Sequence, residues 1–97
     1  MAEYELTLYV TGSDATSNAA ILNIREICEI TIDDYSIDVI DITEHPQLAE
    51  EEKIWATPTL EKELPEPLKR VVGDLSEKSD VLLGLDISTE LPLDEKS

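Results

Sequence analysis

Two side chains of this protein belong to the types that most often carry chemistry at neutral pH, the Cys28 thiol and the His45 imidazole. Each is the only residue of its kind. Dithiol exchange needs two cysteines, and the nucleophilic one lies at a helix start where its pKa is lowered. The turn ahead of the first predicted helix, residues 12–17, contains no sulfur, and Cys28 falls on the apolar stripe of that helix. We therefore expect Cys28 to be a core residue, and dithiol exchange is excluded.

The remaining polar groups do not form a recognisable catalytic or metal-binding set. His45 directly precedes Pro46, and no second His or neighbouring Cys supports a metal site, so we expect His45 to mark a helix entry. The Glu50-Glu51-Glu52 run is typical of a solvated helix face, because hydrolysis would need two acids converging in a cleft. Neither a phosphate-binding glycine loop nor a Ser/His/Asp set is present. The sequence predicts no catalytic residue, no metal site, no cofactor and no enzymatic activity.

Composition limits the possible partners. The chain has 97 residues, enough for one domain, with 23 acidic and 7 basic residues and a formal net charge of −16. Such a surface repels phosphate backbones and anionic lipids, so we expect neither nucleic-acid nor membrane binding. No apolar run approaches the ~20 residues of a membrane span. The absence of a secretory signal and the lone cysteine predict a cytoplasmic protein. The acidity fits either a salty cytoplasm or a basic partner.

The first half of the chain has a clear pattern. Alternation over residues 4–10 predicts a strand with one buried face. Apolar residues at three- and four-residue spacing predict a helix over 17–30, with side-chain oxygens between 13 and 17 available as caps. Apolar residues on both faces of 35–42 predict a central strand of a covered sheet. Strand, helix, strand and a second helix in succession indicate parallel pairing through right-handed crossovers.

The segment from His45 to Leu60 is the first candidate for a functional loop. Pro46 suits the first turn of a short helix whose Leu48 and Ala49 face inward. Pro58 stands where a strand should begin, although proline lacks the backbone donor that a strand needs. An X–Pro bond has only a small preference for trans, so a cis bond facing this loop is within reach.

The second half supports two arrangements. Residues 59–63 and 68–72 could be short strands, followed by a helix that Ser76 caps. Alternatively, a helix could end at Val71-Val72 and residues 81–87 could pair as a strand. Local preference does not choose between the two. We place the domain at residues 1–87 and expect the acidic tail, residues 88–97, to be frayed.

The chain resembles the KaiB family of circadian-clock proteins over residues 4–87. The order and spacing of several motifs carry this resemblance: Leu8-Tyr9-Val10 followed by Gly12, Pro46-Gln47-Leu48-Ala49-Glu50-Glu51, Ala56-Thr57-Pro58-Thr59-Leu60, Leu64-Pro65-Glu66-Pro67, Gly73-Asp74-Leu75-Ser76, and Gly84-Leu85-Asp86. The resemblance implies an α/β thioredoxin-like fold of order βαβαββα, a mixed sheet flanked by helices. It also implies an alternative resting fold, βαββααβ, which differs in the C-terminal half and assembles into tetramers or dimers.

The resemblance further implies a binding protein without catalysis. It would dock on a KaiC-type ATPase through a slow fold switch and modulate the phosphorylation or signalling state of that partner. Lys53 and Lys62 match basic positions that the family uses against KaiC, although either could be an ordinary solvated lysine. The positions that match those biasing the choice of fold are Tyr4, Pro58, Pro65, Pro67, Gly84 and Asp86. The structural alternative for Tyr4, Gly84 and Asp86 is a core aromatic and a plain turn.

The chain also departs from the family pattern. Ala19 and Asp38 stand where the family usually has basic residues, and Glu66 interrupts a run of prolines. The lost charges count against a KaiA-type third partner and weaken the case for a standard KaiC. Three alternatives follow. The chain could be the thioredoxin-like input domain of a clock-linked histidine kinase, a stress-response adaptor outside a full clock, or a thioredoxin-like redox enzyme.

Overall fold

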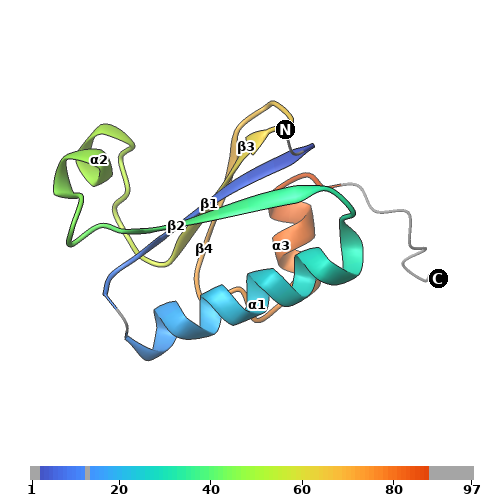
Figure 1. Ribbon diagram of the computed structural model, residues 1–97, viewed down its shortest axis with the longest axis horizontal. Helices are drawn as coiled ribbons and strands as arrows, with labels where there is room; N and C mark the ends of the chain where they lie inside the picture. Colours follow the sequence, from blue (N-terminus) through green and yellow to red (C-terminus); the bar gives the residue numbers. More distant parts are fainter. Residues whose placement is uncertain (1–2, 13, 88–97) are drawn as a thin grey trace.

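The computed structural model describes residues 3–12 and 14–87 of the chain (Figure 1). In chain order the elements are β1 (Tyr4–Val10), α1 (Ala15–Thr31), β2 (Tyr35–Asp41), α2 (Pro46–Glu51), β3 (Thr59–Leu64), β4 (Lys69–Val72) and α3 (Lys78–Gly84). This is the predicted order βαβαββα. It decides the open question of the second half, because residues 59–64 and 69–72 are strands and the last element is a helix. Residues 88–97, the predicted tail, lie outside the described residues.

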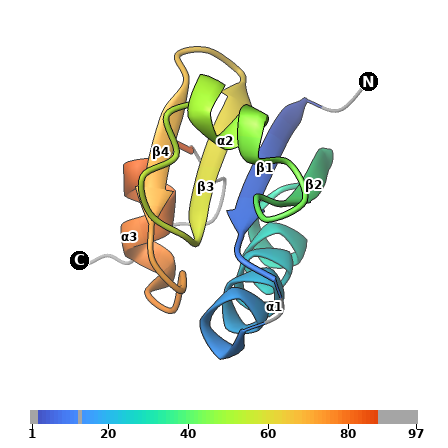
Figure 2. The same cartoon turned by 90° about the vertical axis from the view of Figure 1, so that its left-hand side faces the viewer.

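The four strands form one mixed sheet of order β2-β1-β3-β4 (Figure 2). β1 and β2 are parallel, as predicted, with Tyr4 opposite Tyr35 and Val10 opposite Asp41. β3 runs antiparallel to β1, and β4 runs antiparallel to β3. The prediction that β2 is a central strand is wrong. β3 pairs with the free side of β1, so β2 stays at an edge and its Val39 side chain remains exposed.

The helices α1 and α3 cover the same face of the sheet, whereas α2 projects beyond the strand ends (Figures 1 and 2). The core between helices and sheet is aliphatic. Its buried members are Leu6, Leu8, Val10, Ala20, Ile24, Ile27, Cys28, Ile32, Leu60, Leu75, Val81, Leu82, Leu85 and Ile87. None of the helices in residues 3–12 and 14–87 is long and apolar enough to cross a membrane.

Helix α1 begins two residues before its predicted start. Asp14 is the N-cap, and its Oδ1 accepts a hydrogen bond of 2.7 Å from the Ser17 N–H. This satisfies one of the donors that a helix start leaves unpaired. The predicted cap of the last helix is wrong, because α3 has Glu77 at its N-cap and no side-chain hydrogen bond there.

The second face of β1 also differs from the prediction. The alternation of the strand predicts that Thr7 and Tyr9 face solvent, yet both side chains are buried. They lie on the face of the sheet opposite α1 and α3. A part of the chain other than α1 and α3 must therefore cover this face.

Candidate functional site

Hydrogen bonds join the loops at the carboxyl ends of β1 and β2. The Gly12 N–H donates to Asp41 Oδ1 over 3.0 Å, and the Thr11 and Thr57 hydroxyls lie 2.6 Å apart. The Thr43 hydroxyl and the backbone N–H groups of Gly12 and Thr43 hold the pKa of Asp41 below its ordinary value. The Thr57–Pro58 bond is cis, as the sequence suggested. Redox members of the thioredoxin fold carry their dithiol at the start of the first helix, whereas hydrogen-bonding side chains join the strand ends here.

Cys28 is a core residue, as predicted. Its side chain is fully buried in the apolar cluster beneath the sheet. Burial raises the pKa of the Cys28 thiol to about 12, so the nucleophilic thiolate is not populated at neutral pH.

Helix α2 ends in a motif that fixes the conformation of Lys53. The Lys53 N–H donates to the Glu50 carbonyl over 3.2 Å, and the Ile54 N–H donates to the Ala49 carbonyl over 2.9 Å. These two bonds define a Schellman motif, in which the residue after the C-cap has left-handed backbone torsions. That residue is Lys53, with a φ of 58°. Glycine is the usual residue there, so the lysine occupies a conformation that is uncommon for it.

Helix α3 ends in the same way, and the residue in the left-handed position is Asp86. The Asp86 N–H donates to the Leu83 carbonyl over 3.1 Å, and the Ile87 N–H donates to the Leu82 carbonyl over 2.9 Å. Asp86 has a φ of 57°. Both helices therefore end at positions that the sequence analysis singled out.

Gly84 is the last residue of α3 and packs tightly against β4. A Cβ atom at this position would lie 2.6 Å from Cγ2 of Val71, well inside van der Waals contact. The glycine thus allows a close approach between α3 and β4. Tyr4, at the start of β1, is half-buried against the core.

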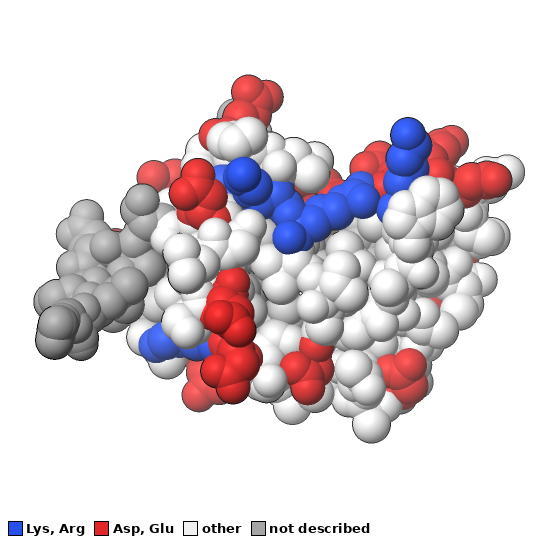
Figure 3. Space-filling view, turned by 180° about the vertical axis from the view of Figure 1, so that it is seen from behind, with Lys and Arg blue, Asp and Glu red and all other residues white. Residues whose placement is uncertain are grey.

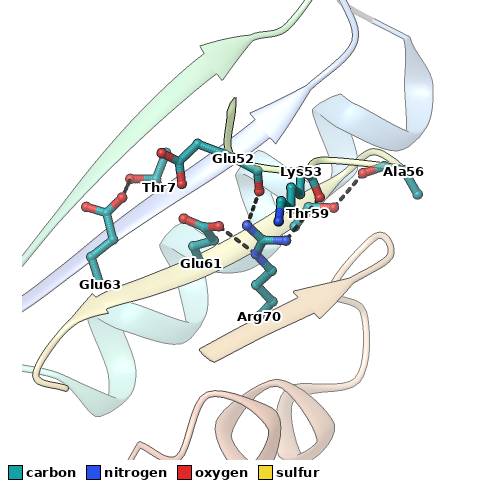
Figure 4. A network of polar contacts seen from close by, with 8 residues as sticks. All are labelled: Thr7, Glu52, Lys53, Ala56, Thr59, Glu61, Glu63 and Arg70. Carbon is teal, nitrogen blue, oxygen red and sulfur yellow. Dashed lines mark hydrogen bonds and ion pairs between the residues drawn. The ribbon is translucent and has the colours of Figure 1, made fainter. Parts of the chain in front are cut away.

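An ion pair on the opposite face of the sheet joins β3, β4 and the end of α2 (Figure 4). Arg70 Nε lies 2.6 Å from Glu61 Oε2. Its Nη1 donates to the Lys53 carbonyl over 3.1 Å, and its Nη2 donates to the Glu52 carbonyl. One guanidinium therefore binds both a neighbouring strand and the chain that leaves α2. Glu61 and Arg70 face each other because they are cross-strand partners in the β3–β4 register.

This network explains the burial of the second face of β1. The segment after α2 lies over that face, and the Thr7 hydroxyl donates to Glu63 Oε2 over 3.1 Å. Burial, reinforced by nearby carboxylates, raises the pKa of Tyr9 to about 12. The Glu61 side chain has no exposed surface, and its Oε1 has no hydrogen-bond partner among the described residues. Burial raises the pKa of the Glu61 carboxyl above its ordinary value, although Arg70 opposes the shift.

This pKa shift predicts a pH dependence of stability. A carboxyl whose folded-state pKa is raised is most favourable to folding when it is protonated in both states. The unfolding free energy of wild type minus that of Glu61→Gln should therefore increase as the pH falls from 7 to below 4.5. Urea unfolding of both proteins across this range measures the difference. A difference that is constant with pH, or that changes in the opposite direction, contradicts the raised pKa.

Lys62 is buried, with 1% of its surface exposed, and its Nζ donates to the Pro65 carbonyl over 2.9 Å. Lys62 is therefore not a solvated lysine, and in this fold its ammonium is not available to a partner, whereas Lys53 is exposed. Pro65 and Pro67 lie in the exposed turn between β3 and β4, and Pro58 is buried. The sequence analysis did not identify Glu61 or Arg70, because no local sequence pattern indicates that these two residues pair across the strands.

His45 is the N-cap residue of α2, as predicted, and makes no side-chain capping bond. It lines a shallow hollow of about 350 Å³ together with acidic and apolar residues of the same helix. Within residues 3–12 and 14–87, no three potential metal-ligating side chains form a group that could hold an ion.

Solved structures with this architecture define the class of the fold. The structure of mitochondrial thioredoxin 3 from Saccharomyces cerevisiae superimposes with a TM-score of 0.70 and 14% identity. The match covers 89% of this chain and 79% of the thioredoxin chain. The N-terminal domain of Synechococcus elongatus SasA superimposes with a TM-score of 0.74 and 21% identity. The match covers 94% of this chain and 90% of the SasA domain. At these identities the likeness concerns the fold alone. The chain is a thioredoxin-like α/β domain.

Sequence comparison gives the family. The model of the KaiB domain matches residues 7–87, and the chain belongs to the KaiB family. It is 54% identical to the circadian clock protein KaiB3 of Synechocystis over 86 residues, 88% of this chain and 84% of that protein. It is 48% identical to the circadian clock oscillator protein KaiB of Synechococcus elongatus over 85 residues, 87% and 83% of the two chains. Proteins of this family are clock proteins without enzymatic activity.

Proposed function

We propose that this chain is a clock or regulatory protein that docks on a KaiC-type ATPase and changes the signalling state of that partner. The observation that carries the proposal is the match to the KaiB domain along residues 7–87. Relatives named as clock proteins share about half of their residues with this chain across nearly its whole length. The likeness to the SasA domain concerns the fold alone, so the kinase-input alternative has weaker support.

The docking-competent form is the thioredoxin-like fold, reached by a slow switch from a self-associated resting fold. Two features support this part of the proposal. Asp86 ends α3 in a left-handed conformation that is uncommon for a residue other than glycine, and Gly84 allows α3 to pack closely against Val71 of β4. The sequence of the same region is also compatible with a different order of helix and strand. A ligand that binds only one of two forms draws the population toward it.

The direct test is to mix the chain with the KaiC-type ATPase of its own genome in the presence of nucleotide. Size-exclusion chromatography should show a complex that grows over hours. An elution profile that stays unchanged for a day contradicts the proposal.

A sharper prediction concerns Lys53. Lys53→Gly removes the cation but keeps the Schellman motif, because glycine adopts the left-handed position without strain. The variant should unfold at the same temperature as wild type or higher, yet bind the ATPase about tenfold more weakly. Lys78→Gln is the matched control, since it removes an exposed lysine from α3, on the other face of the sheet. Equal affinities of wild type and Lys53→Gly would contradict a role of Lys53 in binding.

A further inference from the structure

The segment from Lys53 to Ala56 carries an exposed tryptophan on a rigid support. Trp55 is the only tryptophan of the chain, and 85% of its surface is exposed. Tryptophan is the largest apolar side chain and is more often buried or placed in an interface. Among interface residues, tryptophan is one of the commonest energetic anchors.

Contacts on both sides of Trp55 hold its backbone in place. On one side, the Arg70 guanidinium donates to the carbonyls of Glu52 and Lys53. On the other, the Thr59 hydroxyl donates to the Ala56 carbonyl. These contacts come from β4 and β3, so the segment is fastened to the sheet (Figure 4).

The two residues before Trp55 determine the direction of its side chain. The Ile54 side chain is buried, with 8% of its surface exposed. Lys53, which is exposed, has left-handed torsions. Ile54 thus anchors the segment to the protein, while the next side chain points away from it. A segment whose backbone is held by such contacts loses little further backbone freedom on binding.

The charge around the segment indicates the chemistry of its partner. Lys53 is exposed two residues before Trp55, and Arg70 holds the same segment, in a chain whose net charge is −16. Figure 3 shows Lys and Arg side chains gathered in a band across one face, with Asp and Glu side chains at its margins. A basic band on an otherwise acidic protein favours a partner surface that is acidic at the point of contact.

We infer that Trp55 is the apolar anchor of the surface that docks on the KaiC-type ATPase, and that it enters an apolar recess rimmed by carboxylates. The Arg70–Glu61 pair is the positioning element of this anchor. It acts through the backbone of Glu52 and Lys53 and does not need to touch the partner. The inference rests on the proposed function, because the occupant of the surface is the partner proposed there.

The first test replaces the anchor. Trp55→Ala should weaken binding of the ATPase about 30-fold or more, as expected for an interface anchor. The replacement removes an exposed side chain, so its urea-unfolding midpoint should stay near that of wild type. Leu83→Ala is the matched control, because Leu83 is 80% exposed on α3 at the other face of the sheet. It should bind like wild type.

The second test observes the anchor inside the complex. Labelling with 5-fluorotryptophan gives one ¹⁹F resonance, since the chain has one tryptophan. In the complex, this resonance should resist broadening by a soluble paramagnetic agent. This readout depends on burial in the complex and not on the fold of the free protein. A resonance that broadens as readily as that of an exposed indole overturns the inference.

The third test concerns positioning. Arg70→Lys keeps the charge but loses the planar fork that reaches two carbonyls. Hydrogen exchange of the Ile54 and Trp55 amides should become faster and binding weaker, whereas Lys78→Gln on α3 should change neither.

The outcomes separate the two proposals. If wild type fails to bind the ATPase, the proposed function and this inference both fall. If wild type binds and Trp55→Ala binds equally well, only the inference falls.

Discussion

Arg70→Ala is expected to lower the free energy of unfolding of the thioredoxin-like form by about 2–3 kcal/mol. The reason is that Glu61 has no exposed side-chain surface and its Oε1 lacks a partner among the described residues. Removing one member of a buried ion pair leaves the other charge uncompensated, which typically costs about 3–5 kcal/mol. We expect a smaller loss because the Arg70 side chain keeps 33% of its surface in water, which screens the pair.

Urea unfolding followed by circular dichroism measures this loss, and two further variants identify its cause. Lys69→Ala removes a charge from the neighbouring position of β4, whose side chain points to the other face of the sheet, and should cost much less. Glu61→Gln in the Arg70→Ala background should recover part of the stability, because a neutral amide is cheaper to bury than a carboxylate. If Arg70→Ala and Lys69→Ala are equally stable, the pair has no structural role.

The second prediction is an energetic coupling between Gly84 and Val71. Gly84→Ala gains up to about 1 kcal/mol of helix propensity but places a Cβ against Val71 Cγ2, at 2.6 Å. Val71→Ala removes that methyl group and opens the space. The thioredoxin-like form should therefore be more favourable in free energy in the double variant than the sum of the two single-variant effects predicts. Residues in contact typically show interaction energies of about 0.5–3 kcal/mol.

NMR spectra of the two single variants and the double variant give the populations of the folds and complete the cycle. The rate of ATPase capture should follow the population of the thioredoxin-like form. Gly73→Ala is a useful contrast. Gly73 has a φ of 129°, so this substitution strains the backbone without meeting a neighbour within 4 Å. An additive cycle between Gly84 and Val71 would show that their close approach does not influence the choice of fold.

The periodicity of the first half was sufficient to predict its elements. β1, α1 and β2 lie within two residues of their predicted bounds, and the parallel pairing of β1 with β2 was predicted correctly. These features depend on residues close in sequence, namely apolar spacing, cap residues and the length of the crossover. Cys28 could be assigned to the core for the same reason, because its place on the helix stripe is a local property.

The second half could not be decided in this way. Residues 71–72 and 81–87 have apolar side chains that suit either a strand or a helix, so local preference was balanced. Packing decided the outcome. β3 pairs with the free side of β1, β4 extends the sheet, and Gly84 lets α3 lie close to Val71. The same pairing moved β2 to the edge, against the prediction from its two apolar faces.

By itself, the sequence determined the order of the elements up to α2, the core role of Cys28, the lack of a dithiol and the resemblance to the KaiB family. Only the tertiary structure decided that Glu61 is buried against Arg70 and that Lys62 is enclosed. It also decided that the chain after α2 is fastened across the sheet, with Trp55 pointing outward. The physical reason is distance along the chain. Periodicity records which face of an element is apolar, whereas the partner of a charged side chain depends on the register between strands that meet only after folding.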